Sequence, residues 1–362
     1  MKVPYLDLRV FEPLKSELLE AVATVFDHGR ILLGPEVDTF EAAVADKAGV
    51  AHGIGVDSGS SALLLALRGL GIGPGDEVIT TCLSWIATAN AITMAGATPV
   101  FVDVRDDLNM DPAAIAPAVT ERTKAIIPVH FCGKMCDMKA ICKIAEEHGL
   151  TVIEDCAQAF GGHNADGRAG SFSKVACFSM NCMKVLHSYG EAGCIATDDD
   201  ALADRLRMLR YAGTIGRQDC QVPSMNHRLD TVQAAMLLVN LKRYDEIVSR
   251  RRAIAAMYNE LLSDVAAFQD AGDKDGHIYY TFSIYVDRRD ELMAFLTEKE
   301  IETKLNHAPL MPYHAAYKAR NLGPFPNAER LQKRAICLPV HEKLSDEQVR
   351  YVADCINQFY GS

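Results

Sequence analysis

The feature that most constrains this chain is an alternation of short apolar segments with amphipathic segments over roughly its first 200 residues. The apolar segments are nearly continuous, as expected of strands that are buried on both faces. The amphipathic segments have helical spacing, and Gly149 ends one of them. We therefore predict an α/β domain whose mostly parallel sheet is covered by helices. The predicted strands are 52–56, the end of 71–81, 98–104, 125–131, 150–157, 174–180 and 193–199, and the predicted helices lie within 12–28, 35–49, 57–71, 86–96 and 137–149.

The pattern changes after about residue 200, where a long helical stretch at 228–262 carries a dense cluster of charges. Residues 277–286 alternate as a half-buried strand, and helical segments follow at 290–299 and 345–360. We expect a large domain over 1–245 and a smaller C-terminal α+β domain over 246–362, with the boundary at the long helix.

Composition excludes several classes of function. The net charge of -11 argues against a broad nucleic-acid-binding surface. The spacing of Cys132, Cys136 and Cys142 is not that of a common zinc site, so we predict no metal. No segment has the pattern of a signal peptide or the ~18 apolar residues of a membrane span. We therefore expect a cytoplasmic protein with no membrane partner and with free thiols.

Lys184 is the only lysine, arginine, aspartate or glutamate between Lys174 and Glu191, and Met, Cys, Val and Leu surround it. Such surroundings remove water from the amine and favour its neutral, nucleophilic form, as a Schiff-base lysine requires. The alternative is an ordinary lysine that buries its stem and extends its ammonium to water. The residues elsewhere in the chain must show which of these two interpretations of Lys184 is correct.

A serine-rich turn follows the first predicted strand and opens a helix. Ser60 and Ser61 offer hydroxyl groups beside the free N–H groups of the first helical turn, and Gly59 permits close approach to the backbone. This arrangement suits a phosphate, although an ordinary serine helix cap has the same sequence.

Two further strand ends carry groups that suit a flat cationic ring. Asp155 and Gln158 follow the strand at 150–157, where a carboxylate could hold a protonated pyridine nitrogen. Trp85, the only tryptophan, could stack on the ring, or could simply belong to the core. Together with Lys184 and the serines, these residues fit pyridoxal 5′-phosphate (PLP) better than any other cofactor.

The chain resembles the DegT/DnrJ/StrS family of PLP-dependent sugar aminotransferases, which have fold type I. That resemblance implies a large domain with a mostly parallel sheet of roughly seven strands and a smaller C-terminal domain. The order and spacing of the matching segments make the resemblance specific. These segments are PYLDL (4–8), GPEVDTFE (34–41), SGSSAL (58–63), TANAI (88–92), GATPVFVDV (96–104), PVHFCGKMCDM (128–138), IEDCAQA (153–159), FSMNCMKVLHSYGEAG (178–193), NHRLDTVQAA (226–235), FPNAERL (325–331) and CLPVH (337–341).

The resemblance implies a role for each matching residue around the cofactor. Lys184 would form the internal aldimine and move the proton, and Asp155 would pair with the ring nitrogen. Gln158 would bind the 3-hydroxyl, and Trp85 would stack on the ring. The residues implied to hold the phosphate are Ser60, Ser61, Ser179 and, from a neighbouring subunit, Asn226.

The resemblance also implies a homodimer with shared sites and a reaction in two halves. An amino acid, L-glutamate by resemblance, would give its amino group to a nucleotide-linked 3- or 4-keto-6-deoxyhexose with ping-pong kinetics. The residues implied to contact the substrate are Gly29, Arg30, Ile31, Leu33 and His307.

Some residues depart from the family pattern, and two other functions stay open. Met180 and Asn181 replace the usual aromatic or histidine, and His187–Tyr189 is unusual before the glycines. We expect these changes to line the substrate side. The alternatives are an aminotransferase acting on a keto-cyclitol such as an inosose, and a non-catalytic PLP-binding regulator.

Overall fold

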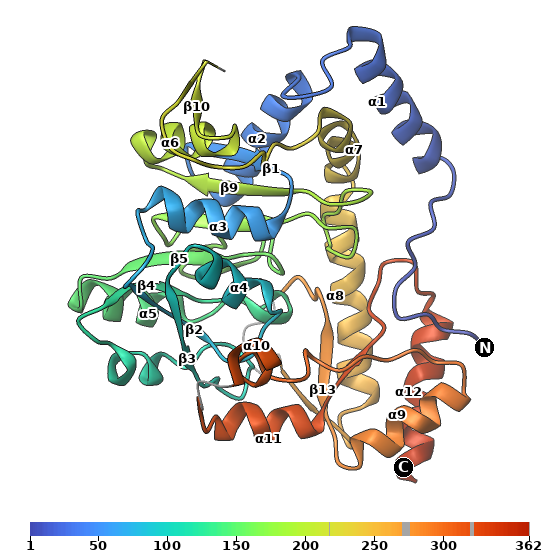
Figure 1. Ribbon diagram of the computed structural model, residues 1–362. Coiled ribbons are helices and arrows are strands. Elements are labelled where there is room, and N and C mark those ends of the chain that lie inside the picture. The colour runs from blue at the N-terminus through green and yellow to red at the C-terminus, as the bar shows by residue number, and fades with distance from the viewer. Residues whose placement is uncertain (217, 270–275, 319–321, 362) are drawn as a thin grey trace.

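A seven-stranded sheet forms the centre of the molecule in the computed structural model, which describes residues 1–216, 218–269, 276–318 and 322–361 (Figure 1). The strand order is β1-β9-β8-β5-β4-β2-β3. Strand β9 runs antiparallel to both of its neighbours, whereas the other neighbours pair in parallel. The strands are β1 (His52–Val56), β2 (Glu77–Thr81), β3 (Thr98–Val102), β4 (Thr123–Ile127), β5 (Thr151–Asp155), β8 (Val175–Ser179) and β9 (Gly193–Thr197). The predicted mostly parallel α/β sheet is confirmed.

Helices cover both faces of this sheet, which explains why its strands are apolar throughout. Successive side chains of β8 point to opposite faces of the sheet. Val175 and Cys177 therefore pack in the core on one face, and Ala176 and Phe178 pack in the core on the other. The first core takes its helices from α3 (Gly59–Gly69), α4 (Ala87–Met94) and α6 (Asp200–Arg210). The second takes them from α2 (Pro35–Ala48), α5 (Met138–Glu147), α7 (Thr231–Leu241) and the start of α8 (Tyr244–Leu261).

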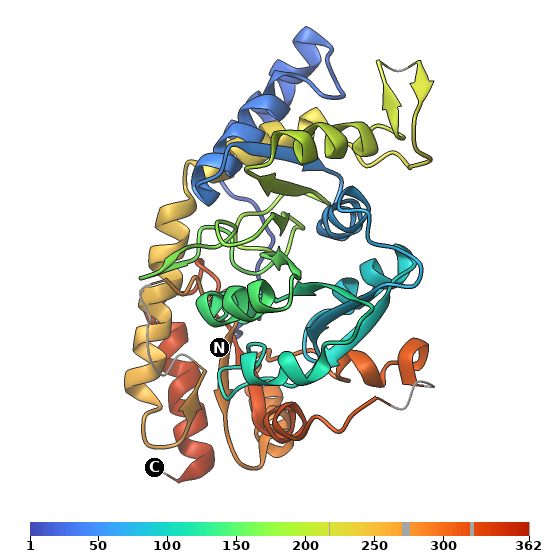
Figure 2. The same cartoon turned by 90° about the vertical axis from the view of Figure 1, so that its left-hand side faces the viewer.

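A third core lies at the other end of α8, around a three-stranded sheet in which β13 pairs with both β12 and β14. Figure 1 shows α9 and α12 beside α8 at this end, and Figure 2 shows the same layers from the side. Val3 also belongs to this core and forms a parallel bridge with Ile301. The elements of this core are β12 (Ala267–Phe268), β13 (Phe282–Tyr285), β14 (Ala335–Leu338), α9 (Arg289–Glu298) and α12 (Asp346–Tyr360). Helices α10 (Ala315–Lys318) and α11 (Pro326–Arg334) pack in a fourth core with residues that follow β2 and β4.

The structure corrects several predicted elements. The stretch 228–262 is two helices, α7 and α8, separated at residues 242–243. Only residues 282–285 of the predicted half-buried strand form β13, and all four are buried because β13 is the central strand of its sheet. The elements that were not predicted are α6, α10, α11, β12, β14, the hairpin β6 (His163–Asn164) with β7 (Gly167–Arg168), the hairpin β10 (Thr214–Ile215) with β11 (Asp219–Cys220), and the 3-10 turns at 112–114, 116–118, 131–133 and 311–313.

Three further expectations concern the whole chain. The expected domain boundary at 245/246 falls inside α8 and stays a prediction. All eleven cysteines have free thiols. Within the described ranges, no helix combines the length and the hydropathy that a membrane span needs.

Candidate active site

A cavity of about 480 Å³ lies where β5 and β8 end, next to the first turn of α3. This is the edge of the sheet at which open α/β proteins bind their ligands. Seven of the predicted site residues line it, and they come from segments spread over most of the chain. These residues are Ser60, Trp85, Asp155, Gln158, Ser179, Lys184 and His307.

The serine-rich turn at residues 58–61 and Ser179 form a closely packed concave surface that suits an anion, which we call the serine cup. Ser58 caps α3, because its side chain accepts a hydrogen bond of 3.1 Å from the N–H of Ser61. A Cβ at Gly59 would lie 2.5 Å from the Cβ of Ser179, so the glycine is needed for α3 to meet the end of β8. Ser60 and Ser179 face the cavity, whereas Ser61 lies within the cap. The helix terminus and these hydroxyl groups suit a phosphate.

Asp155 is a buried carboxylate whose hydrogen-bond partners are uncharged. Thr88 donates to its Oδ2 at 2.9 Å, and the N–H of Ala157 donates to its Oδ1 at 3.1 Å. Burial raises the pKa of Asp155, an effect that these hydrogen bonds and the charge of Lys184 oppose. A cationic ring nitrogen placed beside this carboxylate would supply the missing partner charge.

Gln158 is held in one orientation by the backbone. The N–H of Cys132 donates to Oε1 of Gln158 at 2.8 Å, which leaves the amide nitrogen as the free donor. Cys132 has a φ of 61°, a left-handed conformation that is uncommon for a residue with a side chain. The amide of Gln158 therefore offers the cavity a hydrogen-bond donor, as a phenolic oxygen requires.

Trp85 and His307 lie together at the cavity wall. Trp85 is 59% exposed, which excludes the interpretation that it belongs to the core. The His307 ring centre lies 5.8 Å from that of Trp85 and 5.6 Å from that of Phe131. Burial, with a smaller contribution from Lys184, lowers the pKa of His307 to about 4, so this imidazole is neutral near pH 7.

Lys184 lies half-buried in the loop between β8 and β9. Its Nζ is 4.4 Å from the ring centre of Tyr280, a cation–π distance. The loop is braced from within, because the N–H of Lys184 donates to the carbonyl of Asn181 at 2.8 Å. The lysine therefore faces the cavity beside an aromatic ring, and is not an exposed lysine that extends to water.

The expectation that the unusual residues of this loop line the substrate side is wrong for most of them. Of these residues only Asn181 is part of the cavity wall. Met180 is buried in the core, and Ser188 donates hydrogen bonds to the Met180 carbonyl from both N–H and Oγ. The N–H of Tyr189 donates to Gln233 of α7 at 3.0 Å. These residues therefore brace the lysine loop against the core and α7.

Asn226 and the loop at residues 29–33 do not line the cavity in this chain. Asn226 is exposed and forms a backbone bridge with Tyr211. Leu32 forms a bridge with Asp230, which places the loop and the segment after Asn226 side by side. Their expected roles across a subunit interface stay predictions.

Several other lining residues are not among those predicted from the sequence. Tyr280 and Lys304 lie in no segment that carries the resemblance, Tyr5 lies in PYLDL (4–8) without an implied role, and Arg251 lies in the charged run of α8. The alternation at 277–286 is the available signal for Tyr280, but it predicts only a strand.

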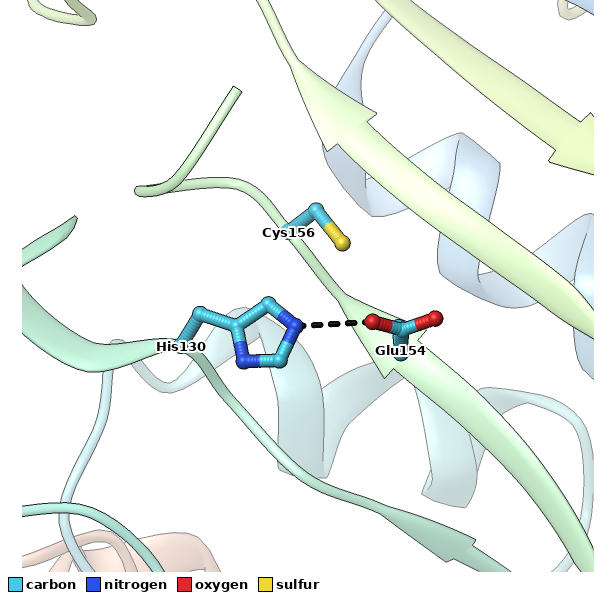
Figure 3. A group of neighbouring side chains, drawn as sticks. All are labelled: His130, Glu154 and Cys156. Carbon is cyan, nitrogen blue, oxygen red and sulfur yellow. Dashed lines mark hydrogen bonds and ion pairs between the residues drawn. The ribbon is translucent and has the colours of Figure 1, made fainter. Parts of the chain in front are cut away.

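A second polar cluster lies on the opposite side of β5 from Asp155 and is drawn in Figure 3. The N–H of Cys136 donates to Nδ1 of His130 at 3.1 Å, so Nε2 carries the hydrogen and donates to Glu154 at 2.9 Å. Glu154 also accepts from two backbone N–H groups and from Ser173. These hydrogen bonds tie the end of β4 to β5 and thereby fix the strand end that carries Asp155.

Comparison with known proteins agrees with this geometry. The sequence pattern of the DegT/DnrJ/EryC1/StrS aminotransferase family matches residues 13–357. A pleiotropic regulatory protein of Geobacillus stearothermophilus is 41% identical over 99% of both chains. The dTDP-3-amino-3,4,6-trideoxy-alpha-D-glucose transaminase of Streptomyces venezuelae is 40% identical over 99% of this chain and 96% of its own.

Solved structures show the same fold. Streptomyces venezuelae DesV, in complex with a ketimine intermediate, superposes with a TM-score of 0.96 at 38% identity over 100% of this chain and 99% of its own. NtdA of Bacillus subtilis, with the bound cofactor PMP, superposes with a TM-score of 0.94 at 26% identity over 100% of this chain and 86% of its own.

Proposed function

Because this chain belongs to the DegT/DnrJ/EryC1/StrS family of PLP-dependent aminotransferases, we propose that it aminates a nucleotide-linked keto-sugar. The acceptor is a 3- or 4-keto-6-deoxyhexose, and the amino donor is an amino acid, L-glutamate. The observation that carries this proposal is the meeting of Lys184, Asp155 and the serine cup in one cavity. Relatives named as transaminases of dTDP-linked and UDP-linked sugars support the class of acceptor.

We assign the cofactor contacts to residues that have free hydrogen-bonding groups or charge facing the cavity. Ser60 and Ser179 hold the phosphate, and Gln158 donates to the phenolic oxygen. Asp155 keeps the ring nitrogen protonated, and Trp85 covers one face of the ring. When bound, PLP supplies an electron sink that makes the hydrogen on the donor's α-carbon acidic.

Lys184 performs the proton transfers in this proposal. In the first half Lys184 would move the proton from the donor's α-carbon to the cofactor carbon that receives the amino group, and in the second half it would move a proton from that carbon to the acceptor carbon. The ring of Tyr280, 4.4 Å from Nζ, would hold the amine in place for these transfers. The 2-oxo acid would leave before the acceptor enters the same cavity, because the amino group would stay on the cofactor between the two halves, so the kinetics are ping-pong.

We further propose a homodimer in which the partner subunit completes each site. Asn226 and the adjoining loop Gly29–Leu33 are the segments that would reach the partner's cavity. Support comes from exposed apolar side chains in the loop, Ile31 and Leu32, and next to Asn226, Met225.

A single-turnover assay tests the choice of acceptor. The holoenzyme is first converted to its aminated form with L-glutamate, and a panel of nucleotide-linked keto-sugars and inososes is then added. Return of the original absorbance with a nucleotide-linked keto-sugar is the expected result. Return only with an inosose would replace the acceptor, and no response to any amino donor would favour a regulator.

A further inference from the structure

The pairing of β8 with β9 continues past the ends of the two strands and leads into the loop that carries Lys184. Two further backbone hydrogen bonds, of 2.7 and 3.0 Å, join residues 180–182 to residues 190–192. Asn181 and Glu191 therefore lie opposite each other across this pair. Both line the cavity, as Lys184 does. The start and the end of the lysine loop thus meet at two polar side chains in the cavity wall.

A hydrogen bond joins these two side chains and fixes the amide of Asn181. Its Nδ2 donates to Oε1 of Glu191 at 2.5 Å, and its Oδ1 accepts from the N–H of Met183 at 2.9 Å. Because the amide oxygen and nitrogen have different partners, only one orientation of the amide satisfies both. Glu191 therefore holds the asparagine from the far side of the loop.

Asn181 also shapes the turn that presents Lys184. Its carbonyl accepts from the N–H of Lys184 at 2.8 Å, which closes a turn of four residues. Its side-chain oxygen accepts from the N–H two residues further on, the bond by which asparagine stabilises many turns. Because both hydrogen bonds constrain residues 182–184, Asn181 sets the direction in which the lysine side chain leaves the backbone.

The backbone of Asn181 acts on the serine cup as well. Its N–H donates to Oγ of Ser179 at 3.4 Å. A hydroxyl group has one hydrogen to donate and can accept through its oxygen. Because Ser179 accepts from Asn181, its own hydrogen stays available for a phosphate in the cavity. One residue therefore contacts both the serine that we assign to the phosphate and the backbone of the lysine.

We infer that Asn181, held by Glu191, is a positioning residue that sets the separation between the phosphate site at Ser179 and the amine of Lys184. The inference rests on the cofactor contacts of the proposed function and not on its acceptor. PLP has to reach both sites at once. A ligand that engages two sites gains affinity from the second only if their separation matches its own length.

Titration of the apoprotein with PLP and with its two parts tests this separation. Pyridoxal lacks the phosphate, and inorganic phosphate lacks the ring. Asn181→Ala removes both side-chain hydrogen bonds without changing the charge, and should raise the Kd for PLP by roughly three- to tenfold. The Kd for pyridoxal and the Kd for inorganic phosphate should each change by less than about twofold, because neither ligand spans the two sites.

Asn164→Ala is the matched control for the loss of a turn. Oδ1 of Asn164 also accepts from backbone N–H groups, those of Asp166 and Gly167, but in the β6–β7 hairpin outside the cavity. This variant should leave all three Kd values within about twofold of the wild type.

Exchange of the two side chains tests the role of Glu191. Asn181→Asp keeps an acceptor for the turn but places two carboxylates opposite each other at pH 8, and should raise the Kd for PLP by roughly two- to fivefold. Glu191→Gln keeps an acceptor for Asn181 and should change the Kd by less than about twofold. The double variant N181D/E191Q restores one donor opposite one carboxylate, and its Kd should return to within about twofold of the wild type.

The inference and the proposed function fail in different ways. If Asn181→Ala leaves the Kd for PLP unchanged, or raises the Kd for pyridoxal or phosphate by the same factor, the positioning role is refuted. If that variant does not fold, a double variant that binds PLP as weakly as Asn181→Asp refutes it. If the Kd values follow the prediction but no keto-sugar is aminated, the positioning role stands and the proposed acceptor falls.

Discussion

At the scale of single residues, Asp155 shows how the site is prepared for its cofactor. Burial raises its pKa above the ordinary 3.8, so the folded protein without cofactor binds a proton there more tightly than the unfolded chain does. That stabilisation is complete below pH 3.8 and is lost as the pH rises through the raised pKa. An ionised Asp155 therefore destabilises the empty protein and becomes favourable only when a cation binds beside it.

The Asp155→Asn variant should consequently behave in opposite ways with and without PLP. Without cofactor, its Tm at about pH 8 should exceed that of the wild type, and the difference should disappear below about pH 4. With cofactor, the order should reverse, because asparagine cannot pair with the ring nitrogen. Thermal melts over this pH range check the prediction, and an apo variant that is less stable than the wild type at pH 8 would contradict it.

At the scale of elements, the contact between α3 and the end of β8 fixes the shape of the serine cup. The Gly59→Ala variant places a Cβ 2.5 Å from the Cβ of Ser179. It should therefore lower the free energy of unfolding by about 1–3 kcal/mol. It should also weaken PLP binding, because the serines move apart. Gly73→Ala is the control, since its nearest atom is 3.5 Å away, and its effect should stay within about 0.5 kcal/mol. Equal denaturation midpoints and equal PLP affinities for the two variants would refute the close contact.

The sequence predicted the elements that build the cup and the sheet because each has a strong local pattern. Strands β5 and β8 read as continuous apolar runs, and Ser58–Ser61 reads as a helix start. Arg251 and Tyr5 were missed because their place in the cavity depends on how α8 and the N-terminal segment pack, which no local pattern encodes. The break between α7 and α8 was missed because residues 242–243 contain neither glycine nor proline.

At the scale of the whole molecule, α1 (Leu14–His28) has apolar residues on two sides. Leu18 and Val25 are buried, whereas Leu19 and Phe26, also seven residues apart, are 61% and 64% exposed. An exposed apolar face next to the loop at 29–33 fits the proposed subunit interface. Phe26→Glu should therefore lower the mass measured by light scattering from dimer to monomer, whereas Met94→Glu, an exposed apolar residue on α4, should not.

The shared site can be tested apart from assembly. Asn226→Ala should leave the mass unchanged but weaken PLP retention, measured as the cofactor left after dialysis. A wild-type protein that is monomeric and fully active would refute both the interface and the role of Asn226.

Reduction of the holoenzyme with borohydride tests the central claim most directly, because it fixes PLP covalently to the amine that holds it. Proteolysis and mass spectrometry then locate the label. The account predicts a pyridoxyl label on Lys184 that is lost in Lys184→Met and retained in Lys174→Met. A label on any other lysine, or no label on a protein that carries PLP, would contradict it.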